Sequence, residues 1–290
     1  MIRCGVAGWD YPDWKGVVYP ASTGRGFDRL AYVARYVDTI EINTSFYRPV
    51  SPNVAESWLS RTAELPDFRF TAKAHRSMTH EPGTGSEEAA RLTLPGLRPL
   101  LDAGRLGALL LQFPQSFHFT RTATERLERA LPHLQHWPVA IEVRHGSWAS
   151  EKAVEWFRSR ELGWCAVDQP RMGDTTLGVL PHVTSSVGYV RMHGRNAADW
   201  FRPDAGRDAR YDYLYSARQL RELAAPLKAM ADTAENLFVV QNNHFRGKAL
   251  VNALQMKALL LDGKPPAPQE LVMAYPGLET AVDVERSRLF

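Results

Sequence analysis

The feature that most constrains this fold is a repeated alternation of short apolar runs with segments of helical periodicity. Eight of the runs have the length and residue content of β-strands. Parallel neighbouring strands need long crossover connections, usually helices, and eight such strands close a TIM barrel. We therefore predict a (β/α)8 barrel with strands at Arg3–Gly8, Thr39–Asn43, Arg69–Ala74, Ala108–Gln112, Val139–Val143, Gly163–Val167, Gly188–Met192 and Leu237–Gln241.

The segments between the strands predict most of the barrel helices. Thr122 and Glu125 have the spacing of a capping box. The sixth unit is expected to be irregular, because residues 169–187 contain two prolines and two glycines and little helical pattern. An open doubly wound sheet is the alternative, but its first turn is usually glycine-rich and residues 8–11 are not. The expected helices are Phe27–Tyr36, Asn53–Glu64, Glu87–Leu101, Ala123–Leu131, Glu151–Glu161, Ser216–Ala234 and Lys248–Leu261.

Length and composition favour a single domain in a reducing compartment. α/β barrels commonly reach 290 residues as one domain, here 1–290, with 269–290 as an extension packed on the barrel. Cys4 and Cys165 lie in apolar runs, which predicts buried free thiols and a cytoplasmic location. A secretory leader is not expected, and the apolar runs are too short for a membrane span. The net charge of +3 does not by itself indicate a nucleic-acid binder, and the oligomeric state stays open.

Alternation along the strands predicts which side chains meet inside the barrel. In the second strand, for example, Ile40 and Ile42 alternate with Glu41 and Asn43. The apolar set should face the helices, so the polar set should point inward. These polar residues come late in their strands and therefore belong at the C-terminal mouth, where barrel enzymes place their sites. The expected inner set is Glu41, Asn43, Lys73, His75, Gln112, Glu142, Arg144, Asp168, Arg191 and His193, with Asn242, Asn243 and His244 of undecided direction.

Three interpretations of this inner set remain open. A purely structural network is one, although buried ion pairs rarely stabilise more than apolar residues would. A divalent metal is the second, since carboxylates and imidazoles are present, but Lys73, Arg144 and Arg191 would repel a cation. Anchoring of an anionic or sugar-like ligand is the third and is favoured, because arginine pairs well with carboxylates and phosphates. No cofactor is predicted.

The segment 194–215, GRNAADWFRPDAGRDARYDYLY, interleaves arginines with aromatic residues. At a barrel mouth this pattern predicts a lid or wall for a stacked ligand, and it also suits single-stranded nucleic acid. An ordered surface loop is the simpler reading. Trp9 and Tyr11 after the first strand, with Phe46 and Tyr47 after the second, add aromatic rings to the same face.

Eight groups of residues form a specific pattern along most of the chain: Gly8–Trp14, Glu41–Tyr47, Lys73 with Thr79–His80, Leu111–Pro114, Glu142–Arg144 with Ser147–Trp148, Asp168, Tyr189–Gly194 and Asn242–His244. In this order they resemble the YecE-like family, a widespread group long labelled a domain of unknown function. The resemblance implies a TIM barrel and carries no established reaction. The fold is similar to xylose-isomerase and endonuclease-IV-like barrels, which suggests DNA-related roles by analogy alone.

The favoured hypothesis is a metal-independent enzyme acting on a small anionic or sugar-like substrate; a nucleic-acid binder or phosphoesterase and a non-catalytic sensor are the alternatives. On the enzyme hypothesis, Glu142→Gln should abolish turnover and leave the melting temperature nearly unchanged, whereas a large loss of stability would support the structural network. The candidate catalytic residues are Glu41, Lys73, Glu142, Asp168 and His193. The candidate substrate-binding residues are Trp9, Tyr11, Asn43, Tyr47, Gln112, Arg144, Arg191, Arg195, Trp200, Tyr211, Asn242, Asn243 and His244.

Overall fold

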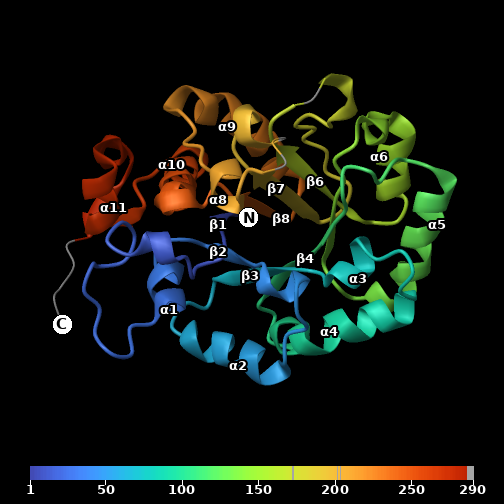
Figure 1. Ribbon diagram of the computed structural model, residues 1–290, viewed down its shortest axis with the longest axis horizontal. Coiled ribbons are helices and arrows are strands. Elements are labelled where there is room, and N and C mark those ends of the chain that lie inside the picture. The colour runs from blue at the N-terminus through green and yellow to red at the C-terminus, as the bar shows by residue number, and fades with distance from the viewer. Residues whose placement is uncertain (172, 201, 203, 286–290) are drawn as a thin grey trace.

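The computed structural model describes residues 1–171, 173–200, 202 and 204–285, and eight parallel strands in this part close a barrel in sequence order (Figure 1). The first and last strands pair through Gly5 and Val240, which completes the ring. The predicted (β/α)8 barrel is confirmed. Its strands are β1 (Ile2–Ala7), β2 (Thr39–Ile42), β3 (Arg69–Lys73), β4 (Leu106–Gln112), β5 (Val139–Glu142), β6 (Gly163–Asp168), β7 (Val187–Met192) and β8 (Asn236–Gln241).

Helices surround the barrel, and the sixth unit is the exception that the sequence predicts. Between β6 and β7 the described residues contain only the short 3-10 helix η5 (Gly173–Thr175), so no α-helix covers this crossover there. The outer helices are α1 (Arg29–Ala34), α2 (Pro52–Arg61), α4 (Ser86–Asp102), α5 (Arg121–Ala130), α6 (Glu151–Arg158), α9 (Ala217–Thr233) and α10 (Lys248–Leu261).

The start of α5 corrects one expectation. The cap is Thr120, whose hydroxyl accepts from the backbone N–H of Ala123 at 3.2 Å. The prediction of a capping box from Thr122 and Glu125 is wrong, because Thr122 already lies in the first helical turn and Glu125 pairs with Arg121 instead. A threonine three residues before a glutamate therefore does not by itself fix where a helix begins.

Two separate apolar clusters show which way the strand residues face. The larger cluster combines strand and helix residues, so it fills the space between the barrel and the helices. The smaller cluster contains strand residues alone and therefore fills the barrel interior. Its members are Ala7, Ala108, Leu110, Ala140, Cys165, Val167, Val187, Tyr189, Phe238 and Val240.

Close contact between β1 and β2 makes Gly5 a sensitive position. A Cβ atom on Gly5 would lie 1.8 Å from the carbonyl oxygen of Thr39. We expect Gly5→Ala to lower the free energy of unfolding by about 1–3 kcal/mol, since the two strands must separate to admit a methyl group. Urea denaturation measures this. Gly24→Ala is the control, with no heavy atom within 4 Å of its Cβ, and equal midpoints for both variants would contradict the prediction.

The described part of the segment after α10 contributes Ala267, Leu271, Leu278 and Val282 to the larger apolar cluster. It contains β9 (Pro266–Pro268), α11 (Gln269–Ala274) and β10 (Asp283–Glu285), and β9 pairs with β10. Leu271 is fully buried, and the hydroxyl of Tyr275 donates to the carbonyl of Arg246 at 2.7 Å. Residues 286–290 of this predicted extension lie outside the described part. Within it, no helix has both the length and the apolar character needed to cross a membrane.

Candidate active site

The centre of the site is a chain of ion pairs that crosses the barrel below its mouth. Arg191 of β7 donates from Nη2 to Glu41 Oε1 at 2.7 Å and from Nη1 to Glu142 Oε2 at 2.6 Å. The other oxygen of Glu142 accepts from Nη2 of Arg144 at 2.6 Å. Glu41 of β2, Glu142 of β5 and Arg191 of β7 are joined by Arg144, two residues after β5, and the formal charges of the two acids and two arginines cancel.

Hydrogen bonds continue this chain to a fourth strand. The hydroxyl of Tyr189 donates to Glu41 Oε2 at 2.9 Å, and the hydroxyl of Thr71 lies 2.7 Å from that of Tyr189. Glu41 and Tyr189 are fully buried. Both carboxylate oxygens of Glu41 are therefore occupied by protein donors. The inward direction of Glu41, Glu142, Arg144 and Arg191 agrees with the alternation of the strands.

Glu142 is held in its ionised form. Burial alone would raise the pKa of this carboxyl, but the adjacent guanidinium groups of Arg144 and Arg191 outweigh burial and hold the pKa well below its usual range. Glu142 therefore carries no proton to give at neutral pH. Its position suits the anchoring of two arginines better than general acid catalysis.

His193 is a neutral imidazole beside this network. Burial, and after it the positive charge of Arg191, lowers its pKa to about 3. The side-chain nitrogen of Asn242 lies 2.9 Å from Nδ1, while Nε2 lies 3.4 Å from Nη2 of Arg144 and 3.7 Å from Glu142 Oε1. His193 therefore stays neutral at physiological pH and accepts a proton only in acidic solution.

Lys73, the last residue of β3, is the unusual cation of the mouth. Its ammonium donates to Gln112 Oε1 at 3.0 Å and lies 4.2 Å from the ring centre of Phe46. No carboxylate oxygen among the described residues is within ion-pair distance of Lys73 Nζ, and the side chain stays partly exposed. Burial, followed by the charge of Arg191, lowers its pKa to about 7. A large fraction of this amine is neutral at physiological pH.

Asp168 does not belong to the inner set, and that prediction is wrong. Cys165 and Val167 of β6 join the interior cluster, so Asp168 has the outward register. Its carboxylate accepts from Nε and Nη2 of Arg195, the latter at 2.5 Å, and from the hydroxyl of Tyr215 at 3.2 Å. Both registers of β6 are apolar, so alternation could not decide between them. Asp168 ties the 194–215 segment to β6.

The three residues after β8 point in different directions. Asn242 faces inward to His193. Asn243 is fully buried and donates to the carbonyl of Tyr213 and to Asn252 of α10, which places it behind the barrel wall. His244 is stacked against Tyr11, with ring centres 4.4 Å apart. Only Asn242 of the three joins the central network.

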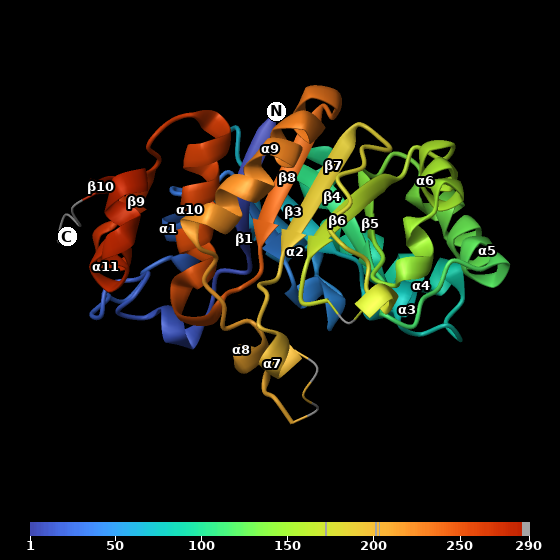
Figure 2. The same cartoon turned by 90° about the horizontal axis from the view of Figure 1, so that it is seen from above.

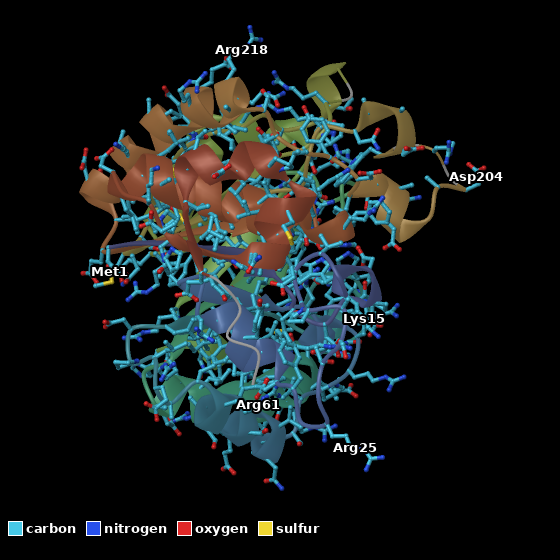
Figure 3. All side chains as sticks on the ribbon, turned by 90° about the vertical axis from the view of Figure 1, so that its left-hand side faces the viewer. Met1, Lys15, Arg25, Arg61, Asp204 and Arg218 are labelled. Carbon is cyan, nitrogen blue, oxygen red and sulfur yellow. The ribbon has the colours of Figure 1, made fainter. Side chains whose placement is uncertain are left out.

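The 194–215 segment projects beyond the C-terminal ends of the strands as α7 (Ala197–Trp200) and α8 (Arg207–Arg210) (Figure 2). Figure 3 shows Asp204 of this segment on the opposite side of the molecule from Met1. The ring centre of Trp200 lies 5.6 Å from those of both His193 and Tyr211. Tyr211 in turn lies 5.2 Å from His244. These rings form one wall of the mouth. Phe201 lies outside the described residues.

The other residues predicted to line the mouth differ in their contacts and exposure. Trp9 packs edge-on against Trp58 of α2 at 5.8 Å, toward the helix layer. Tyr47 is 67% exposed, and the neighbouring Phe46 contacts Lys73 instead. Asn43 follows β2 at the mouth and is partly exposed. Phe46, and not Tyr47, is therefore the aromatic neighbour of Lys73, although only Tyr47 is among the predicted substrate-binding residues. Nothing in the sequence distinguishes these two adjacent aromatic residues in a loop.

A divalent cation finds few free ligands in this arrangement. Across the described ranges, no group of three or more His, Cys, Asp or Glu side chains is placed to hold a metal ion. The carboxylates of Glu41 and Glu142 already accept from arginines, and Asp168 is paired with Arg195. The donor chemistry of this mouth therefore fits polar or anionic organic groups better than a metal.

A closed parallel barrel with paired charges across its lumen and a partly exposed amine at its C-terminal mouth defines a TIM-barrel protein with a polar site. Within that class, the chain belongs to the family described as "Protein of unknown function DUF72", whose sequence profile matches residues 3–271.

Relatives and solved structures agree with this assignment. The chain is 30% identical over 273 residues to the UPF0759 protein YunF of Bacillus subtilis, covering 90% of this chain and 95% of the relative. The UPF0759 protein YecE of Escherichia coli O157:H7 is 27% identical over 178 residues, covering 58% of each chain. A DUF72 family protein from Thermotoga maritima, known from a crystal structure, is 32% identical in sequence to this chain. The two structures superpose with a TM-score of 0.77, covering 90% of this chain and 99% of that one. A DUF72 family protein from Enterococcus faecalis has a TM-score of 0.79 and 26% identity, covering 90% and 96%.

Proposed function

We propose that this protein is a metal-independent enzyme that acts on a small anionic or sugar-like substrate at the C-terminal mouth of the barrel. The observation that carries the proposal is Lys73, a partly exposed amine whose pKa burial lowers to about 7, beside a charge-balanced buried network. A strongly perturbed lysine in such a place is typical of a group that exchanges protons or attacks a substrate.

The surrounding residues have distinct roles in this proposal. Arg144 keeps 17% of its side chain exposed and can donate to a carboxylate or hydroxyl of the substrate. Glu142 and Glu41 hold Arg144 and Arg191 in place rather than transfer protons. Trp200 and Tyr211 offer ring faces against which a sugar ring or planar group can pack.

Nucleic-acid binding is the less favoured alternative. The 194–215 segment contains four arginines and four aspartates, and Arg202 pairs with Asp199 at 3.0 Å and with Asp204 at 3.3 Å. Arg195 is likewise paired with Asp168. A phosphate backbone binds chiefly through uncompensated positive charge, and this segment offers little of it.

A thermal-shift screen of 2-oxo acids, sugar phosphates and free sugars tests the proposal. A bound compound should raise the melting temperature of the wild type, and Trp200→Ala should weaken its binding about tenfold through loss of one aromatic wall. Met273→Ala, at a side chain that is 65% exposed on α11, is the control and should bind as the wild type does.

Two results would contradict the proposal. One is that no compound in the three classes stabilises the wild type. The other is that Trp200→Ala and Met273→Ala bind an active compound equally well, which would place the binding site away from the mouth.

A further inference from the structure

We propose that the substrate carries an aldehyde or ketone group, and that Lys73 forms a Schiff base with it. This inference rests on the proposed function and names the class of its substrate. It adds a covalent step at one atom, Nζ of Lys73, on the last residue of β3.

The contacts of Lys73 leave its amine free to react. Its hydrogen bond goes to a neutral amide oxygen of Gln112 at 3.0 Å, and its other neighbour is the apolar ring of Phe46. Two other lysines with little exposure differ in this respect. Lys257 and Lys248 are paired with Asp38 and Asp212, and each keeps about a fifth of its side chain exposed, at 20% and 21%.

Burial and the charged groups around Lys73 explain why a large fraction of its amine is neutral and why the nitrogen can still become a positively charged iminium. Arg191 and Arg144 disfavour the ammonium, while Glu41 and Glu142 favour a positive charge there, and burial exceeds each of them. His80, with a pKa lowered to about 4 chiefly by burial, adds no charge. Gln112 and Phe46 complete the surroundings with neutral groups.

The reaction is balanced without a further reagent. The Lys73 ammonium first gives one proton to solvent, and the lone pair of the neutral Nζ then attacks the carbonyl carbon to form a C–N bond. One N–H proton passes to the former carbonyl oxygen and makes it a hydroxyl. The proton released at the start returns to this hydroxyl, which leaves as water while the nitrogen lone pair forms the C=N bond. An ammonium and a carbonyl thus give a protonated imine and one water, so the positive charge at the mouth is unchanged and the network of Glu41 and Glu142 still offsets it.

Arg144 and the aromatic wall narrow the range of carbonyl compounds that fit the site. The exposed part of Arg144 favours a carboxylate or hydroxyl next to the carbonyl. Two probes cover these cases: pyruvate for 2-oxo acids and glycolaldehyde for sugar-like carbonyls. Either is incubated with the full chain and sodium cyanoborohydride, which reduces an imine to a stable amine that peptide mass spectrometry locates.

At pH 7 we expect the reduced adduct on Lys73 to exceed that on Lys257 by a hundredfold or more, since an ordinary lysine has a pKa near 10.4 and is almost wholly protonated. The rate of trapping at Lys73 should rise through about pH 7 and then level off. Lys73→Arg should lose this adduct and keep the background labelling of Lys15, which is exposed at the surface.

Equal labelling of Lys73 and Lys257 with both probes would overturn the Schiff base. The proposed function has a separate test. If pyruvate or another compound raises the melting temperature in a Trp200-dependent manner without an adduct on Lys73, the Schiff base is refuted and the site remains. If neither stabilisation nor adduct occurs with any compound, both proposals are refuted.

Discussion

Replacing Lys73 by methionine is expected to stabilise the fold while removing the reactive amine. The gap between the pKa of about 7 and the ordinary value of 10.5 corresponds to as much as about 5 kcal/mol of disfavoured charge. Partial exposure of the side chain and loss of the hydrogen bond to Gln112 reduce this, so we expect a gain of roughly 2–3 kcal/mol in the free energy of unfolding at pH 6.

The pH dependence of this gain has a definite sign. The folded-state pKa of Lys73 lies below its unfolded value, so the unfolded chain binds more protons between about pH 7 and 10.5. The wild type is penalised fully below pH 7 and recovers as the pH rises toward 10.5. The advantage of Lys73→Met should therefore be largest at pH 6 and fade toward pH 10.

Urea denaturation at pH 6 and pH 9 measures both effects, and Lys257→Met is the matched control. Lys257 is also partly buried but pairs with Asp38 at 2.6 Å, so its loss should destabilise the fold slightly. A Lys73→Met variant that is less stable than the wild type at pH 6 would show that the fold favours the ammonium. Such a stability gain from removing a group is typical of functional residues that are kept at a cost.

The second large effect is expected from Glu142→Gln, which should lower the free energy of unfolding by about 3–5 kcal/mol. An amide cannot neutralise Arg144 and Arg191, and breaking one member of a buried network leaves uncompensated charge. The sequence alone predicts a nearly unchanged melting temperature for this variant. Full burial of Glu142 reverses that part of the expectation.

Acid titration adds a second readout for Glu142. Its folded-state pKa is well below the ordinary 4.5, so its contribution to stability is complete above that value and is lost as the pH falls below it. The difference between wild type and Glu142→Gln should shrink below about pH 4. The control is Glu155→Gln. Glu155 pairs with Arg158, but its side chain is 65% exposed, so this change should alter the free energy of unfolding by less than about 0.5 kcal/mol. Equal denaturation midpoints for both variants at pH 7 would refute the network.

The barrel and most of the inner set are predictable from sequence for one physical reason. β2, β5 and β7 each alternate polar with apolar residues, which fixes the register of Glu41, Glu142 and Arg191. β6 is apolar in both registers, so the outward direction of Asp168 has no sequence signal. The inward direction of Tyr189 follows from the same alternation as that of Arg191. A tyrosine in an apolar run, however, is usually interpreted as a core residue, so its hydrogen bond to Glu41 is not predicted.

Contacts made by loops are the other part that the sequence does not determine. The choice of Phe46 rather than Tyr47 as the neighbour of Lys73 depends on the turn of the 3-10 helix η2 (Thr44–Phe46). The direction of Asn243 depends on how α10 presents Asn252. Such contacts arise from the packing of segments distant in sequence, which alternation along one strand does not encode.

The 194–215 segment is held near both of its ends, by the pair of Arg195 with Asp168 of β6 and by the pair of Asp212 with Lys248 of α10. These fastenings do not involve the charge network under the mouth, which is balanced within itself. The contacts that hold the 194–215 segment are thus separate from the ion pairs of the central network. Under the proposed function, exchanging residues 197–211 for another sequence of similar length is expected to alter the choice of ligand, while the register of the strands and the position of Lys73 stay as they are.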